Sequence, residues 1–223
     1  MTIYSQAQEV AIERISKKDI HICVIGVGTI GLPLATFLAK NGFPVKGLDI
    51  NEQRVNEINL GNIIYEYQND LKILVNEKKL VATTNVKVAL EKAEIIFICV
   101  PTPLNKNNEM DIFNLTEVAK RIKDHLKKGM LLIFESSVAI GTTAKIASHI
   151  ENLTNLKFGV DLGLAYCPER YNPTPMVKIQ HDKQFNSMAR GITFSLDKIN
   201  RIVGGIDKKS TELARTIYSQ FVV

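Results

Sequence analysis

The chain has 223 residues, enough for one large α/β core, and its 45% hydrophobic and 23% charged residues are typical of a globular protein. No apolar run approaches the roughly 20 residues that span a bilayer, and residues 1–18 lack the basic-then-apolar order of a secretory signal. We therefore expect no membrane partner and a cytoplasmic location. The net charge of +5 is modest and spread along the chain, which argues against nucleic-acid binding. The three cysteines lack metal-ligand spacing, which argues against a metal site.

Short apolar runs alternate with segments of helical period along the chain. Residues 1–18 are expected to form a polar helix or arm ahead of a domain that covers residues 19–223. Strands are predicted at residues 21–26, 45–50, 81–84, 94–100 and 130–134, at the end of 158–166, and at 200–203 before a break at Gly204 and Gly205. Helices are predicted at residues 29–40, 52–60, 71–79, 86–92, 114–127, 142–153 and 208–220, with Asn114 as a cap.

The alternation of strands and helices predicts the fold class. Strands separated by helices of about ten residues form βαβ units, and right-handed crossovers place the helices on both faces of the sheet. We therefore predict an α/β fold with a doubly wound, mostly parallel sheet of Rossmann type in a single domain. Residues 171–193 show no clear period, and a loop of that length is either functional or disordered.

The first predicted strand runs into the sequence GVGTIG at residues 26–31, a GxGxxG pattern that opens a helix. In this context Gly26 permits a tight turn, Gly28 lets a pyrophosphate approach the backbone, and Gly31 lets the helix pack closely on the strand. Thr29 and Ile30 belong to the same turn, where free N–H groups at the helix start bind phosphate. The pattern therefore predicts a dinucleotide site.

Asp49 ends the second predicted strand. A carboxylate at this position accepts hydrogen bonds from ribose hydroxyls and repels the extra phosphate of NADP. The sequence therefore predicts NAD as the cofactor. FAD remains a minor alternative, and so does a glycine turn beside an unrelated aspartate.

Three further segments follow predicted strands and are expected at the carboxyl edge of the sheet, where ligands bind in such folds. They are Val100-Pro101-Thr102-Pro103, Glu135-Ser136-Ser137-Val138 and Tyr166-Cys167-Pro168-Glu169-Arg170. The hydroxyl groups are candidates to hold a ribose, a carbonyl or a water, although a rigid proline turn and helix capping by Thr142 are competing interpretations. Glu169 and Arg170 form either a surface ion pair or a base beside an anion-binding group. Cys167 has no evident histidine partner, so we expect a structural thiol.

The order and spacing of these motifs resemble the UDP-glucose/GDP-mannose dehydrogenase family, nearest to its branch of UDP-N-acetylmannosamine dehydrogenases. The matching segments are GVGTIGLPLA from Gly26, LDINEQRV from Leu48, KLVATTN from Lys79, VPTPL from Val100, ESSVAIGTT from Glu135, YCPER from Tyr166 and RIVGG from Arg201. They match the family's first domain across nearly the whole chain. Several ordered motifs are far more specific than the glycine pattern alone.

The resemblance implies an activity and assigns roles to particular residues. The activity is an NAD-linked oxidation of the C6 hydroxyl of a UDP-sugar to a carboxylate, in which two hydrides leave in succession. Arg54 then lies with Asp49 at the adenosine end, and the cofactor cleft is lined by Val100, Pro101, Thr102 and Ser136. Ser137 stands where the family has a threonine that positions a catalytic water, and Glu169 matches the glutamate implicated in the hydrolytic half. Glu169, Arg170 and Tyr171 face the sugar nucleotide.

The sequence also departs from the family pattern. Ala139 stands where the family usually has proline, and residues 174–193 look like an insertion. The family's catalytic cysteine lies in a second domain, in a motif ending CxPKD that these residues do not contain. The resemblance therefore implies that the chain binds NAD without turning over a UDP-sugar by itself. A stand-alone NAD-binding or regulatory module and one half of a split enzyme remain alternatives, with a homodimer or a complementary C-terminal chain as partners.

Overall fold

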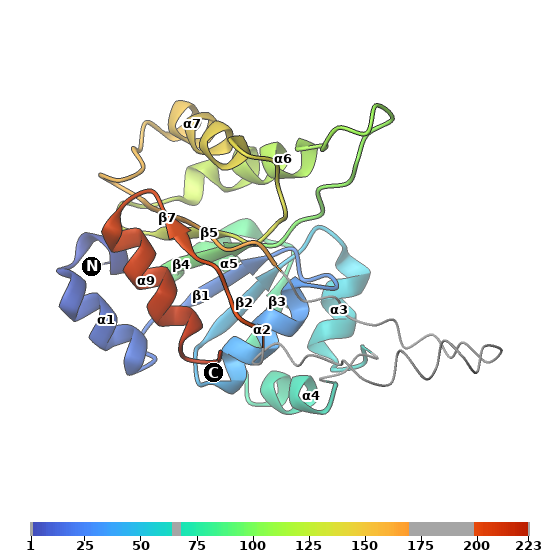
Figure 1. The fold of residues 1–223 in the computed structure, drawn as a ribbon. Coiled ribbons are helices and arrows are strands. Elements are labelled where there is room, and N and C mark those ends of the chain that lie inside the picture. The colour runs from blue at the N-terminus through green and yellow to red at the C-terminus, as the bar shows by residue number, and fades with distance from the viewer. Residues whose placement is uncertain (1, 64–67, 170–198, 223) are drawn as a thin grey trace, which may run out of the picture.

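A central sheet runs through the computed structural model, which describes residues 2–63, 68–169 and 199–222 (Figure 1). Within these residues its seven strands lie in the order β3-β2-β1-β4-β5-β6-β7. The bounds are β1 Ile22–Ile25, β2 Val45–Leu48, β3 Leu80–Thr83, β4 Ile95–Ile98, β5 Leu131–Phe134, β6 Gly163–Tyr166 and β7 Gly204–Gly205. Neighbouring strands are parallel except for the antiparallel pair β6 and β7. The predicted mostly parallel, doubly wound sheet is confirmed.

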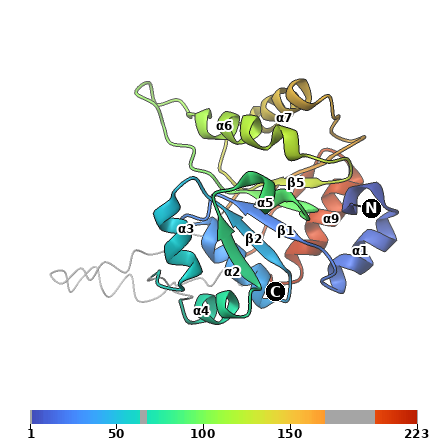
Figure 2. The same cartoon turned by 180° about the vertical axis from the view of Figure 1, so that it is seen from behind.

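Helices cover both faces of the sheet (Figures 1 and 2). One layer consists of α1 Gln8–Ser16, α2 Gly31–Lys40, α3 Glu52–Asn59, α4 Gln68–Asn76 and α9 Lys208–Tyr218. The other layer consists of α5 Val86–Leu90, α6 Phe113–Ile122 and α7 Thr142–Thr154. Two short 3₁₀ helices, η1 Ile3–Ser5 and η2 Lys123–His125, complete the described helices. None of the helices in the described ranges is long and apolar enough to cross a membrane.

The strand side chains divide the core into two clusters. Ile22 and Val24 of β1 belong to the cluster under α2 and α9, whereas Cys23 and Ile25 belong to the cluster under α6 and α7. Successive side chains of a strand point to opposite faces, so a strand buried on both faces needs an unbroken apolar run. All four residues of β1 are buried, as are those of β4 and β5. The core therefore fixes the central strands whose carboxyl ends carry the site.

The last strand corrects a prediction. Residues 200–203 were expected to be a strand that breaks at Gly204 and Gly205, but they are irregular and the two glycines form β7. Gly205 pairs with Ala165, and a Cβ on Gly205 would clash with Thr211 at the start of α9. Ile202 is exposed, so the apolar pattern of this segment did not report burial in a sheet. Glycine is needed here because the strand passes close beneath a helix.

Two helix starts also differ from the prediction. Asn114 was expected to cap its helix, but α6 begins one residue earlier and is capped by Ile112 without a side-chain hydrogen bond. The Nδ2 atom of Asn114 donates instead to the carbonyl oxygen of Pro101, at 2.9 Å. Thr142 is the first residue of α7 rather than its cap, which is Gly141. Asn114 is thus held by the loop that follows β4.

Candidate functional site

The chain order creates a crevice at the carboxyl edge of the sheet. After β1 the chain moves outward to β2 and β3, and then returns to place β4 on the other side of β1. Ligands of doubly wound folds bind at such a switch point. A pocket of about 620 Å³ lies there, within the usual range of about 300–1,000 Å³ for ligand sites. Its lining includes eleven of the residues predicted above: Gly26, Gly28, Thr29, Ile30, Asp49, Val100, Pro101, Thr102, Ser136, Ser137 and Glu169.

The glycine turn after β1 is shaped by what surrounds each glycine. Gly26 has φ of 84°, in the left-handed region, and a Cβ there would lie 2.9 Å from the carbonyl oxygen of Cys99. A Cβ on Gly31 would clash with the carbonyl oxygen of Gly26, so the start of α2 packs directly on the turn. A Cβ on Gly28 would meet no atom within 4 Å. The turn therefore leaves open space above Gly28, next to the N–H groups that begin α2.

Asp49 lies at the end of β2 with its carboxylate held in place. Its Oδ2 atom accepts a hydrogen bond from the N–H of Val27, and its Oδ1 atom accepts one from the N–H of Asn51, both at 3.0 Å. Each carboxylate oxygen keeps a further lone pair for a hydroxyl donor. Arg54 lies in the first turn of α3 but outside the residues that line the pocket. The oriented carboxylate and the open glycine turn together fit the diphosphate and ribose of a dinucleotide.

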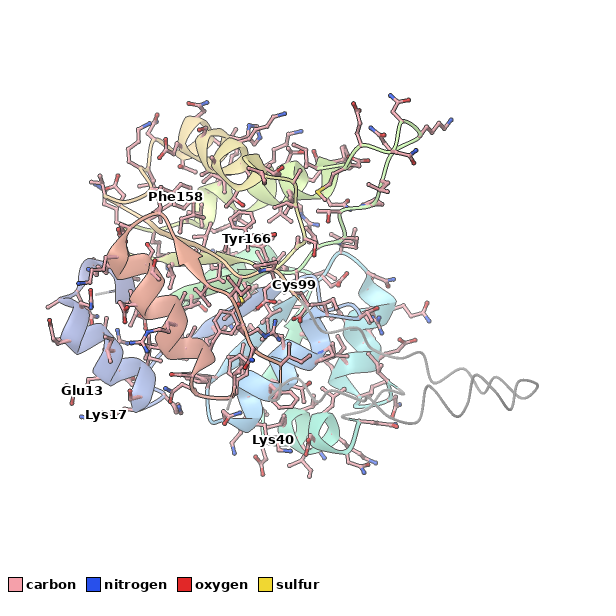
Figure 3. The ribbon with its side chains drawn as sticks, in the orientation of Figure 1. Glu13, Lys17, Lys40, Cys99, Phe158 and Tyr166 are labelled. Carbon is pink, nitrogen blue, oxygen red and sulfur yellow. The ribbon has the colours of Figure 1, made fainter. Side chains whose placement is uncertain are left out.

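Three loops form the opposite wall and are joined to one another. The hydroxyl of Thr102 donates to the carbonyl oxygen of Ser137, and that of Ser136 to the carbonyl oxygen of Val100, each at 2.7 Å. The phenol oxygen of Tyr166 accepts from the N–H of Val138 at 3.3 Å. Figure 3 labels Tyr166, the last residue of β6, and Cys99, which follows β4. The hydroxyl protons of Thr102 and Ser136 thus hold the wall together, while the exposed Ser137 faces the pocket.

Glu135 and Glu169, which line the pocket, belong to a buried charged cluster. The Nη1 atom of Arg201 lies 2.7 Å from Glu169 Oε2 and 3.4 Å from Glu135 Oε2. The hydroxyl of Tyr218 in α9 donates to Oε1 of Glu135. The side chains of Arg201, Glu169 and Glu135 are 3%, 6% and 0% exposed, so this guanidinium and both carboxylates are removed from water. The guanidinium of Arg201 therefore forms ion pairs with both buried glutamates.

Burial shifts the ionisation of the groups in and around this cluster. It raises the pKa of Glu135 to about 8, and the charge of Glu169 adds to the rise while Arg201 and Tyr218 oppose it. Burial also raises the pKa of Cys167 to about 12 and that of Cys99 well above its ordinary value, with the nearby carboxylates contributing. Both thiols stay protonated near neutral pH, and a thiol in that state is a poor nucleophile.

Several pocket residues were not predicted from the sequence to be cofactor-binding or catalytic. Asn114, Glu117, Val118 and Arg121 present one side of α6 to the pocket, and Cys99 and Glu135 line its floor. The helical residues recur at intervals of three or four, which is a detectable signal once the helix is known to flank the site. Arg201 was noted only within the motif RIVGG, and Tyr218 carried no signal. The predicted site residues Arg170 and Tyr171 lie outside the described residues.

Comparison with known proteins identifies the family. A family model described as "UDP-glucose/GDP-mannose dehydrogenase family, NAD binding domain" matches residues 20–222. A UDP-N-acetyl-D-mannosamine dehydrogenase from Methanococcus aeolicus is 36% identical over 218 residues, which cover 95% of this chain and 44% of that protein. The solved UDP-D-ManNAc dehydrogenase from Pyrococcus horikoshii has a TM-score of 0.77 at 33% identity, covering 91% of this chain and 45% of its own. The UDP-N-acetyl-mannosamine dehydrogenase from Staphylococcus aureus has a TM-score of 0.74 at 30% identity, with the same coverage of 91% and 45%.

These matches agree with the geometry of the site. The chain spans less than half the length of the relatives, and the part that it matches holds the glycine turn, the aspartate at the end of β2 and the pocket between them. The family model covers nearly all of the chain. The chain therefore belongs to the UDP-glucose/GDP-mannose dehydrogenase family and forms its NAD-binding domain.

Proposed function

We propose that these residues hold NAD for a nucleotide-sugar dehydrogenase that oxidises the C6 hydroxyl of UDP-N-acetylmannosamine, or of a closely similar UDP-sugar, to the carboxylate. The observation that carries the cofactor site is the pairing of an open backbone at Gly28 with an oriented carboxylate at Asp49 in one pocket. The names of the relatives support the substrate class, because both the sequence and the structural matches include UDP-N-acetylmannosamine dehydrogenases.

The same geometry orients the cofactor in our proposal. The diphosphate lies against the start of α2, and the adenosine ribose bonds to Asp49. Arg54, in the first turn of α3, is close enough in sequence to Asp49 to serve the adenosine end. The nicotinamide half then extends the other way, over the carboxyl ends of β4, β5 and β6, where Val100, Ser136 and Glu169 line the pocket. The nicotinamide ring supplies the hydride acceptor for the oxidation.

We assign the chemistry on the protein side to the nicotinamide end of the pocket. Glu169 acts as the acid–base group for the hydrolytic half of the reaction, and Ser137 helps to hold the water. The exposed hydroxyl of Ser137 and the carboxylate of Glu169 line the same pocket, which supports this pairing. Glu169 also faces the sugar nucleotide in the proposal, together with Arg170 and Tyr171.

The three cysteines of the chain do not supply a nucleophile for the second oxidation. Cys23 and Cys167 are fully buried, and burial raises the pKa of each to about 12. Cys99 is likewise held as a thiol. We therefore propose that these residues bind NAD but do not oxidise a UDP-sugar without a reactive thiolate from elsewhere in the enzyme or from a partner chain. The free thiols also support a cytoplasmic location.

Titration calorimetry and an NADH assay on the same chain test the proposal. We expect saturable binding of NAD and binding of NADP at least tenfold weaker, because Asp49 repels the extra phosphate. Asp49→Asn is the matched variant, because it keeps the shape of the side chain and removes its charge. In this variant the difference between the affinities for NAD and NADP should become smaller. With UDP-N-acetylmannosamine and NAD, no sustained NADH production is expected. Folded protein that takes up no NAD, or robust turnover by the chain alone, would refute the proposal.

A further inference from the structure

The buried cluster of Glu135, Glu169, Arg201 and Tyr218 contains two carboxyl groups but one guanidinium. The proposed function does not account for this excess of acidic groups. Arg201 is the one guanidinium among the described residues that contacts both carboxylates. If both acids were ionised, the cluster would carry a net negative charge in a site almost without water, which is costly. A single proton on the carboxylate pair removes that charge. The geometry therefore favours a cluster that holds one proton.

We propose that this cluster makes the pocket distinguish the oxidised from the reduced cofactor: Glu135 gives up a proton when the cationic nicotinamide ring of NAD⁺ binds and keeps it when the neutral ring of NADH binds. The proposal rests on the cofactor orientation given above. In that orientation the nicotinamide half lies over the ends of β4, β5 and β6. Glu135 ends β5 and lines the pocket there, beside Cys99 and Ser136.

The groups that face Glu135 are consistent with this role. From the end of β4 comes Cys99, from the segment after β6 come Cys167 and Glu169, from the irregular segment before β7 comes Arg201, and from α9 comes Tyr218. Neither thiol ionises near neutral pH, and Arg201 does not lose its proton. Burial raises the pKa of Glu135 to about 8, so this carboxyl is able to hold a proton near neutral pH.

When the positively charged nicotinamide ring of NAD⁺ lies at this end of the pocket, the ionised form of Glu135 becomes the favoured one. An opposite charge nearby favours the ionised carboxylate and lowers its pKa. On binding of NAD⁺ the O–H bond of the Glu135 carboxyl breaks, the electron pair stays on the carboxylate, and the proton passes to solvent. Among the described residues, Nε and Nη2 of Arg201 are buried without a hydrogen-bond partner. These two N–H groups of the guanidinium are therefore able to donate hydrogen bonds to Glu135 once it is ionised.

The linkage has a defined sign. A proton that must leave on binding makes the affinity for NAD⁺ rise with pH, by up to tenfold per unit, until the pKa of free Glu135 is passed at about 8. The ring of NADH carries no charge, so its affinity shows no such rise. The preference for NAD⁺ over NADH therefore grows as the pH rises through neutrality.

Calorimetry in two buffers of different ionisation enthalpy measures the proton directly. Near pH 7 we expect the chain to release a substantial fraction of one proton, and at most one, when NAD⁺ binds, and close to none when NADH binds. Glu135→Gln should abolish the release and make the two nucleotides share one pH profile. Asp49→Asn is the control, because it should weaken both nucleotides while leaving the proton release in place.

Tyr218→Phe provides a second test that keeps the carboxylate. The Tyr218 hydrogen bond lowers the pKa of Glu135, so its removal should move the rise in NAD⁺ affinity to higher pH. Equal proton release by NAD⁺ and NADH, or unchanged release in folded Glu135→Gln, would overturn this inference while leaving the cofactor site intact. Failure of the wild-type chain to bind either nucleotide would instead overturn the proposed function on which the inference rests.

Discussion

At the scale of single residues, the glycine turn separates a ligand requirement from a folding requirement. Gly28 and Gly31 belong to the same sequence pattern, but a Cβ on Gly28 would stand in open space and one on Gly31 would clash with the backbone of Gly26. The fold needs a glycine at position 31. The packing of the fold does not require a glycine at position 28, so the glycine there is explained by a ligand that approaches the backbone.

The first prediction uses this difference. Gly28→Ala should leave the thermal unfolding midpoint close to that of the wild type, because the added methyl meets no neighbour, yet lower the affinity for NAD at least tenfold. Gly31→Ala should lower the free energy of unfolding by roughly 1–3 kcal/mol through overpacking. Calorimetry with NAD and urea denaturation measure the two effects. Unchanged NAD affinity in Gly28→Ala would show that the phosphates lie elsewhere.

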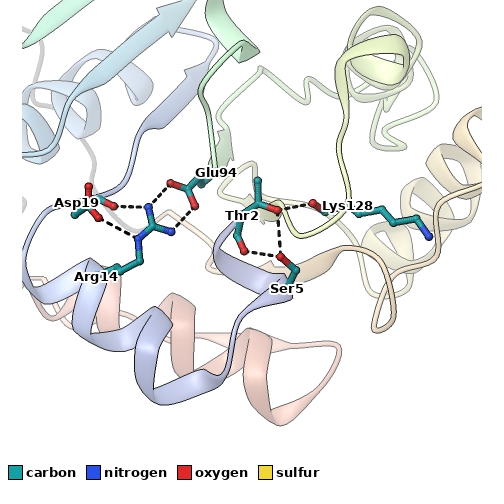
Figure 4. Close-up of polar contacts among 6 residues, drawn as sticks. All are labelled: Thr2, Ser5, Arg14, Asp19, Glu94 and Lys128. Atoms are coloured by element: carbon teal, nitrogen blue, oxygen red, sulfur yellow. Dashed lines mark hydrogen bonds and ion pairs between the residues drawn. The ribbon is translucent and has the colours of Figure 1, made fainter.

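At the scale of secondary-structure elements, α1 is fastened to the domain from two sides. It packs beside α9, and Ile15 on its inner face is fully buried (Figure 1). The guanidinium of Arg14 donates two hydrogen bonds, of 2.8 and 2.7 Å, to the carboxylate of Glu94 just before β4. It also forms an ion pair with Asp19 (Figure 4). Parallel guanidinium–carboxylate bonds of this kind are strong and directional. The segment expected to be a polar helix or arm therefore contributes to the core.

The second prediction concerns this fastening. Arg14→Ala should lower the free energy of unfolding by roughly 1–3 kcal/mol, because Glu94 is left nearly buried without its partner. Lys17→Ala is the matched control: it removes the neighbouring ion pair with Glu13, in which both side chains are exposed. That variant should leave the urea midpoint unchanged within error. Equal effects of the two substitutions would contradict a structural role for the Arg14–Glu94 pair.

At the scale of the whole molecule, the buried acid Glu135 affects how folding depends on pH. Its pKa rises from an ordinary 4.5 to about 8 on folding, chiefly through burial. The folded state therefore binds this proton more tightly than the unfolded chain does. Its contribution to stability is fully present below about 4.5 and is lost as the pH rises to about 8.

The third prediction follows from that sign. The free energy of unfolding of the wild type should fall between about pH 5 and about pH 8, by an amount on the order of a few kcal/mol. Glu135→Gln carries no titrating group at this position and should flatten the fall. Urea denaturation at a series of pH values measures both. Parallel curves for the two proteins would mean that Glu135 is not protonated in the folded state.

Part of this molecule was predictable because the relevant interactions are local. The unbroken apolar runs fixed β1, β4 and β5, since a strand buried on both faces tolerates no polar break. The glycine turn and the aspartate at the end of β2 belong to consecutive elements of one βαβ unit, so their spacing alone placed them together. Capping and the last strand were less predictable, as Asn114 and residues 200–203 show, because loop packing outweighed local preference.

The sequence by itself therefore determined the central strands of the sheet and the cofactor turn, which depend on neighbours along the chain, and the ordered motifs indicated the family. Only the tertiary structure brought Tyr218 to Glu135 across 83 positions and Arg201 to Glu169 across 32. No periodicity connects such residues, because their contact depends on how α9 and the segment before β7 pack against the carboxyl edge of the sheet. The raised pKa of Glu135 depends on that packing too, since the pKa of a carboxylate is set by the charges and the loss of water around it rather than by its place in the chain.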